Sequence, residues 1–167
     1  MKSKIAEEMR TLMKTKVAQT GLASIFAVAL TLSMAAPAQA EDESCSVARV
    51  AGTYGVSDSG TVLGIGPRAA LGRLTLEADG RITGTVTASL NGAVTTGTVT
   101  GTYTVSPDCS GTTTFGEYDQ SGNLLITATV ALVWDDKMRE VRLLFTSVVL
   151  PDGTSLATIV NGDARKK

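Results

Sequence analysis

The sequence of 167 residues contains no histidine. Without an imidazole, the chain cannot assemble the Ser/His/Asp or Cys/His groups of many hydrolases, and most zinc sites lose their usual nitrogen ligands. Aromatic residues make up only 4% of the chain, and cysteine occurs twice. We therefore expect no metal and no cofactor, and no catalytic residue can be named from these residue types.

Basic residues are scarce in the part of the chain that we expect to be exported. Residues 41–167 carry ten Lys and Arg side chains against fourteen Asp and Glu, a net charge of −4. Such a chain offers no basic patch to neutralise the phosphates of a nucleic acid. Nucleic acid is therefore not an expected partner.

An apolar run occupies residues 21–36, preceded by Lys14 and Lys16 and followed by Ala38-Gln39-Ala40. This layout is typical of a secretory signal peptide with an A-x-A cleavage site, so we expect cleavage after Ala40. The run has about 16 residues, fewer than the ~20 that a membrane-spanning helix needs, so no integral membrane segment is expected afterwards.

Two consequences follow from this signal. Residues 1–40 are the predicted signal peptide, and translation could start at Met1 or at Met13. Residues 41–167 are expected to form a single domain with a periplasmic or secreted location. Both cysteines, Cys45 and Cys109, lie in the exported part, where an oxidising compartment favours a disulfide between them. Free thiols are the less favoured alternative.

The clearest strand pattern lies in the middle of the chain. From Ile82 to Leu90, apolar or glycine residues alternate with Thr and Ser, and Asn91-Gly92 then supplies the pair best suited to a type I′ hairpin turn. The following strand keeps the same phase as far as Val105. Two antiparallel strands with one apolar face are therefore predicted.

The preceding turn fixes the register. A three-residue turn at 78–80 with a glycine bulge places Leu76 opposite Ile82 in the core and Glu77 opposite Arg81 in solvent, where we expect an ion pair.

The rest of the exported chain contains further short alternating segments separated by Gly, Pro, Asn and Asp. About eight strands of this kind predict an all-β fold, an antiparallel up-and-down barrel or a barrel-like meander. The expected strands outside the central pattern are 50–56, 111–118, Leu124–Trp134, 141–146 and 155–160, with 57–66 as a loop and 163–167 as a frayed tail.

The segment Gly101-Thr102-Tyr103-Thr104-Val105, followed by Asp108-Cys109-Ser110-Gly111-Thr112, resembles a segment of a group of small secreted bacterial proteins, as does Gly52-Thr53-Tyr54-Gly55. The likeness covers most of the exported chain. It implies a calycin-like barrel and export, and it supplies no catalytic residues.

Carboxylates are the remaining candidates for chemistry. Asp119 and the pair Asp135-Asp136 all lie in predicted turns, where acidic residues usually serve turn geometry, and Glu117 with Asp119 is a weak candidate for calcium. The structural interpretation is favoured for each of them.

A cavity is the other candidate site. The inward positions include many glycines and alanines, which could leave space for an apolar ligand or could simply let the strands bend and close. We favour the second interpretation. The residues that would line such a cavity are Tyr54, Tyr103, Phe115, Trp134 and Phe145.

These features favour an exported, non-enzymatic barrel that binds a small apolar ligand or a protein partner. A protease-inhibitor-like barrel, with residues 57–67 as its contact loop, is one alternative, and a barrel associated with the outer membrane is another. A histidine-free cyclase or isomerase is the third.

Overall fold

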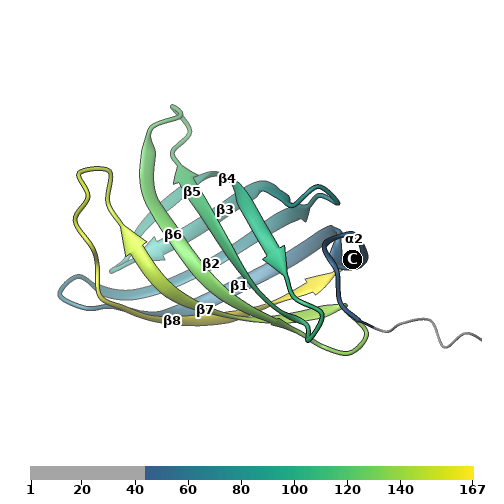
Figure 1. Ribbon diagram of the computed structural model, residues 1–167. Helices are drawn as coiled ribbons and strands as arrows, with labels where there is room; N and C mark the ends of the chain where they lie inside the picture. Colours follow the sequence, from purple (N-terminus) through teal and green to yellow (C-terminus); the bar gives the residue numbers. More distant parts are fainter. Residues whose placement is uncertain (1–43) are drawn as a thin grey trace, which may run out of the picture. The chain divides into compact units, whose positions relative to one another are not determined.

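The computed structural model describes residues 44–167, which form a closed barrel of eight antiparallel strands (Figure 1). Each strand pairs with the next one along the chain, and β8 pairs with β1 to close the barrel. The predicted up-and-down barrel is thus confirmed. Its strands, after the short helix α2 (Val47–Val50), are β1 (Gly52–Val62), β2 (Gly66–Leu76), β3 (Arg81–Leu90), β4 (Ala93–Val105), β5 (Ser110–Tyr118), β6 (Leu124–Trp134), β7 (Glu140–Val149) and β8 (Thr158–Lys166).

The predicted signal peptide lies outside the described residues and remains a prediction. Within residues 44–167, no helix is long and apolar enough to cross a membrane.

The central hairpins have the predicted registers. Leu90 pairs with Ala93 across Asn91 (φ 49°) and Gly92 (φ 86°), the positive angles that a type I′ turn requires. Leu76 pairs with Ile82 across the preceding turn.

Arg81 does form an ion pair at that turn, but the expected partner, Glu77, is wrong. The guanidinium of Arg81 contacts Asp79, at 2.7 Å from Nε to Oδ2, instead of Glu77. Asp79 lies in the turn itself and also accepts the backbone N–H of Arg81 at 3.1 Å, so the short local loop holds the carboxylate beside the guanidinium. Both side chains are exposed, and the pair contributes little to stability.

Two segments expected to be irregular are strands. Residues 57–62 continue β1 and Gly66–Leu76 is β2, so only 63–65 remain as a turn, and the expected loop at 57–66 is wrong. The expected frayed tail at 163–167 is wrong too, because residues 163–166 belong to β8 and pair with β1. Both segments lack the apolar alternation that predicts a strand, because their inward positions include small and charged residues such as Asp58 and Ala164.

The core fills the barrel in two groups of buried side chains. The larger group extends from Val50 and Tyr54 to Trp134 and Phe145, and a smaller one consists of Ala70, Val86, Ala88 and Val99 on β2, β3 and β4. Leu74 and Phe115 pack against both groups.

Inward glycines serve the closure of the barrel. A Cβ atom at Gly84 would overlap the carbonyl oxygen of Arg73 on the neighbouring strand, and one at Gly101 would overlap that of Thr114. The absence of a side chain at these positions lets adjacent strands coil closely around each other. The interpretation of these glycines as closure residues is therefore the one that fits their surroundings.

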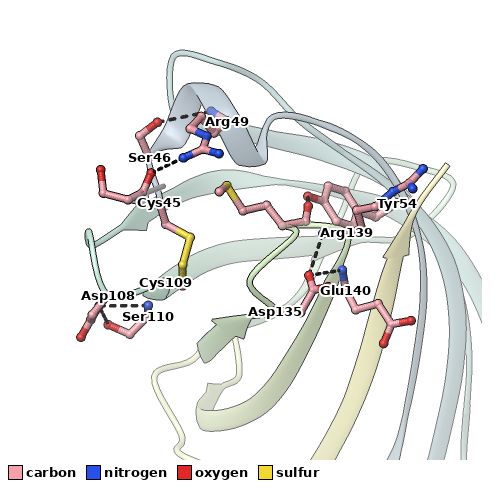
Figure 2. The surroundings of a disulfide bond; sticks show 12 residues. Cys45, Ser46, Arg49, Tyr54, Asp108, Cys109, Ser110, Asp135, Arg139 and Glu140 are labelled. Atoms are coloured by element: carbon pink, nitrogen blue, oxygen red, sulfur yellow. Dashed lines mark hydrogen bonds between the residues drawn. A yellow bond between two sulfur atoms is a disulfide. The ribbon is translucent and has the colours of Figure 1, made fainter. Parts of the chain in front are cut away.

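One end of the barrel is covered by α2, and we call it the capped end. The disulfide between Cys45 and Cys109, with 4.9 Å between the Cα atoms, ties the segment just before α2 to the β4–β5 turn (Figure 2). The backbone N–H of Cys45 also donates to the carbonyl of Pro107 at 3.2 Å. Val50 at the end of α2 is completely buried, so the helix plugs this end with an apolar side chain.

Candidate functional site

An internal cavity of about 70 Å³ lies between the two groups of core side chains. A water molecule needs about 10–15 Å³ of such space, so the cavity has room for a few water molecules. An apolar cavity of roughly 150 Å³ admits benzene, and the space here is about half as large. Most of the wall is indeed apolar, with Leu76, Ile82, Val99 and Val130 among its residues.

The aromatic residues singled out from the sequence all lie on this wall: Tyr54, Tyr103, Phe115, Trp134 and Phe145. The rings of Phe115 and Phe145 meet edge to face, with centroids 6.2 Å apart and an interplanar angle of 85°. Such a geometry is favourable for aromatic pairs beyond the area that they bury.

The two tyrosines hold the cap in place. The hydroxyl of Tyr54 donates to the carbonyl of Val50 at 2.6 Å, and that of Tyr103 donates to the carbonyl of Glu77 at 2.7 Å, with the carbonyl of Val47 3.2 Å away. Burial raises the pKa of Tyr54, and it raises the pKa of Tyr103 to about 12. Both phenols are therefore neutral near pH 7, and their hydroxyl groups connect the barrel to the helix by hydrogen bonds.

Trp134 contributes an indole N–H to the same end of the cavity. Its Nε1 is the one fully buried side-chain nitrogen or oxygen atom of residues 44–167 without a well-formed hydrogen bond. The indole lies beside the Tyr54 hydroxyl and lowers the pKa of that phenol, against the larger effect of burial, but the two groups are not aligned as donor and acceptor.

Three charged side chains also face the cavity: Asp58 on β1, Arg68 on β2 and Glu117 on β5, which we call the ionic cluster. Nε of Arg68 donates to Oδ1 of Asp58 at 3.0 Å, and its second guanidinium nitrogen lies 3.7 Å from Oε2 of Glu117. None of the three side chains is more than 10% exposed.

The electrostatics of the ionic cluster centre on Glu117. Burial raises the pKa of the Glu117 carboxyl, the positive charge of Arg68 lowers it, and the negative charge of Asp58 raises it further, with a net upward shift. Arg68 also lies over the ring of Phe145, with Cζ 5.7 Å from the ring centroid. Such a cation–π contact is stronger away from water and holds the guanidinium against the wall.

Arg68 and Phe145 separate two spaces. A second cavity of about 40 Å³ lies beyond them, towards the end of the barrel opposite the cap, and the same two residues belong to its wall. Leu156, just before β8, and Thr158, the first residue of β8, are part of this second wall.

Sequence reasoning missed most of the ionic cluster. Asp58 was assigned to a loop, and Glu117 was considered only with Asp119 as a calcium site. The signal was present in the phase of the strands, because Arg68 shares the inward parity of Leu74 and Leu76. An inward charge on one strand predicts an opposite charge on a neighbour, since buried charges are paired.

The carboxylates expected in turns do serve the turns. Asp119 accepts the backbone N–H groups of Ser121 and Asn123, each at 2.8 Å. Asp135 accepts those of Arg139 and Glu140, at 2.7 and 2.8 Å (Figure 2). The side-chain amide of Asn123 also donates to Asp119, and this hydrogen bond, followed by the backbone ones, lowers the pKa of Asp119. The backbone hydrogen bonds from Glu140 and Arg139 lower the pKa of Asp135.

The weak calcium candidate, Glu117 with Asp119, does not converge. Glu117 lies inside the barrel, whereas Asp119 is held by its own turn. Among the residues that the structure describes, no group of three or more acidic or cysteine side chains is placed to hold a metal ion.

The chain is weakly similar to several solved structures. No family model and no curated protein matches the sequence. A redesigned β-barrel, mFAP1, bound to DFHBI is 13% identical, with 72% of this chain and 98% of that chain covered and a TM-score of 0.48. The S-type phycobiliprotein lyase CPES from Guillardia theta is 9% identical, with 75% and 95% covered and a TM-score of 0.42. Similarity of this degree transfers neither a ligand nor an activity.

Proposed function

We propose that this protein is an exported binding protein that holds a small, mainly apolar molecule inside its barrel. The observation that carries the proposal is the internal cavity, whose wall combines aromatic rings with a buried ionic cluster at one side. Apolar walls with a few polar groups are the usual composition of small-molecule sites. The space suits a small apolar group, and a ring the size of benzene would enter only if side chains of the wall moved outwards.

The position of the disulfide supports export. Cys45 and Cys109 are bonded, and such bonds form and persist in oxidising compartments such as the periplasm or the cell exterior. The location proposed for the protein is therefore periplasmic or secreted.

The outer face of β3 and β4 favours water over lipid. Facing pairs on β3 and β4 are threonines, Thr83 with Thr100, Thr85 with Thr98 and Thr87 with Thr96. A barrel that spans the outer membrane carries an apolar band on this face instead. The protease-inhibitor alternative loses its contact loop, because residues 57–62 are part of β1.

The test is native mass spectrometry of the protein purified gently from its own exported fraction, comparing two variants on β6. Val130 is 2% exposed and faces the cavity, whereas Val133 is 55% exposed on the outside of the same strand. We expect a mass excess that disappears on denaturation in the wild type and in Val133→Phe. The same excess should be absent from Val130→Phe, whose larger side chain fills the cavity.

Circular dichroism must show that Val130→Phe remains folded, since overpacking a core costs about 1–3 kcal/mol. A bound molecule retained by folded Val130→Phe would place the ligand elsewhere on the protein. A wild type without any bound mass, which also fails to bind added benzyl alcohol, would contradict the proposal.

A further inference from the structure

The charges in the ionic cluster do not balance. Asp58 and Arg68 form a close pair at 3.0 Å, which leaves the carboxyl of Glu117 with a guanidinium nitrogen at 3.7 Å, beyond hydrogen-bonding distance. Glu117 is 4% exposed and borders the cavity, and no group of residues 44–167 donates a hydrogen bond to its carboxylate. When all three groups are ionised, the cavity wall therefore holds one negative charge in excess.

An unbalanced charge of this kind is costly in a buried site. Removing one partner of a buried pair strongly destabilises a protein, because the remaining charge is uncompensated. The free protein can reduce this cost by keeping a proton on Glu117, and the pKa of that carboxyl is indeed shifted upwards. A positively charged group placed in the cavity would remove the same cost.

The excess of one negative charge indicates which charge the ligand should carry. An anionic head would face Glu117 and Asp58 and would raise the excess to two negative charges, while a neutral hydroxyl would leave it at one. A single positive charge brings the total to zero. The apolar part of such a ligand would lie against Phe115 and Val130, which share the cavity wall with the carboxyl group.

We propose that the ionic cluster is a head-group site for a small aromatic or aliphatic amine, whose ammonium group pairs with the carboxylate of Glu117. The Asp58–Arg68 pair keeps the guanidinium to one side, and the contact of Arg68 with Phe145 holds it there. The ammonium would donate hydrogen bonds to a carboxylate that has none in the free protein. This inference rests on the proposed binding of a ligand inside the barrel and adds the chemical class of that ligand.

The test uses three probes of nearly equal shape that differ in the charge of the head: benzylamine, benzyl alcohol and benzoate at pH 7. Trp134 is the single tryptophan and lies on the cavity wall, so its fluorescence reports occupancy, with isothermal titration calorimetry as a second measurement. We expect benzylamine to bind at least tenfold more tightly than benzyl alcohol, and benzoate to bind most weakly.

Two variants separate the head-group contact from general effects of charge. Glu117→Gln should bind benzylamine at least tenfold more weakly and benzyl alcohol about as well as the wild type. Glu140→Gln is the matched control, because Glu140 is 47% exposed and its ion pair with Arg165 lies on the surface. It should keep the preference for benzylamine.

The outcomes distinguish this inference from the proposed function. Binding of benzyl alcohol with no preference for benzylamine would overturn the amine site and leave interior binding intact. Failure of all three probes to bind would overturn both. The comparison of the three probes on the wild type is decisive by itself. The proposal can therefore be overturned even if Glu117→Gln does not fold.

Discussion

The carboxyl group of Glu117 shows how one residue can link the stability of the barrel to pH. Burial raises its pKa above the ordinary value of 4.5, and the neighbouring charges are those of Arg68 and Asp58. An acid with a raised pKa in the folded state binds more protons there than in the unfolded chain. Its contribution to stability is therefore fully present below about pH 4.5 and is lost as the pH rises through the folded pKa.

We predict that the Glu117→Gln variant does not lose stability in this way as the pH rises. The free energy of unfolding of the wild type should fall, relative to that of Glu117→Gln, as the pH rises from 4 to 8, because only the wild type must ionise a buried carboxyl. Urea unfolding followed by circular dichroism at several pH values measures the difference.

The difference between the two proteins is needed because other groups have the opposite effect. Asp119 and Asp135 have lowered pKa values and contribute stability that is lost as the pH falls, but they are the same in both proteins. Glu140→Gln should follow the wild type. Parallel pH profiles for the wild type and Glu117→Gln would show that Glu117 carries no such linkage.

Among the elements, α2 is the one whose position depends on a covalent bond. Four residues are too few for a stable isolated helix, so α2 relies on the disulfide, on the buried side chain of Val50 and on the hydroxyls of Tyr54 and Tyr103. These contacts make the cap part of the barrel rather than a separate segment.

We predict that replacing both cysteines by serine lowers the free energy of unfolding by about 4 kcal/mol, given the separation of 64 residues between Cys45 and Cys109. Chemical denaturation of the wild type with and without a reducing agent supplies the matched comparison. The reduced wild type should resemble the double variant, and the double variant should not respond to the reductant. Equal stability of oxidised and reduced wild type would contradict this prediction.

The strands differ in how clearly their own residues predict them. β3 and β4 could be predicted in register because Asn91-Gly92 and the alternation beside it agree with each other. The second half of β1 could not, because Asp58 takes an inward position that an apolar residue usually takes. Its partner Arg68 lies on another strand, and local pattern cannot reveal a charge that is compensated across strands.

The same limit applies to the candidate site. Aromatic residues such as Tyr54 and Trp134 could be placed on the inner face from the phase of their own strands. The presence of a cavity depends on how both groups of core side chains meet, which no single strand determines. The 3.7 Å separation between Arg68 and Glu117 depends on the closed barrel as a whole.

At the scale of the whole molecule, the barrel closes through unequal ladders. β8 forms nine residue pairs with β1 but only five with β7, from Glu140 with Arg165 to Leu144 with Asn161. The β7–β8 ladder is thus a short seam in a structure whose other strands pair over longer stretches. Opening it would expose two strand edges to other chains.

We predict that removing residues 163–167 opens this seam. Only the pairs Leu143 with Gly162 and Leu144 with Asn161 would remain between β7 and β8, so the truncated protein should aggregate or unfold. Size-exclusion chromatography and thermal unfolding measure the effect. Removal of Lys167 alone, which costs one backbone hydrogen bond to Thr53, is the control and should leave a folded monomer. A truncated protein that stays monomeric and melts as before would contradict this role of the seam.

Both boundaries of the described chain lie at the capped end (Figure 1). Nζ of Lys166 donates there to the carbonyl of Arg49 at 3.2 Å. A tether attached at either boundary would hold the barrel by its cap. The opposite end, with the turns at 63–65 and 91–92, would then point away from the support. The molecule is thus suited to display on a surface in one orientation, and a peptide joining its two boundaries would allow new termini at the distant turns.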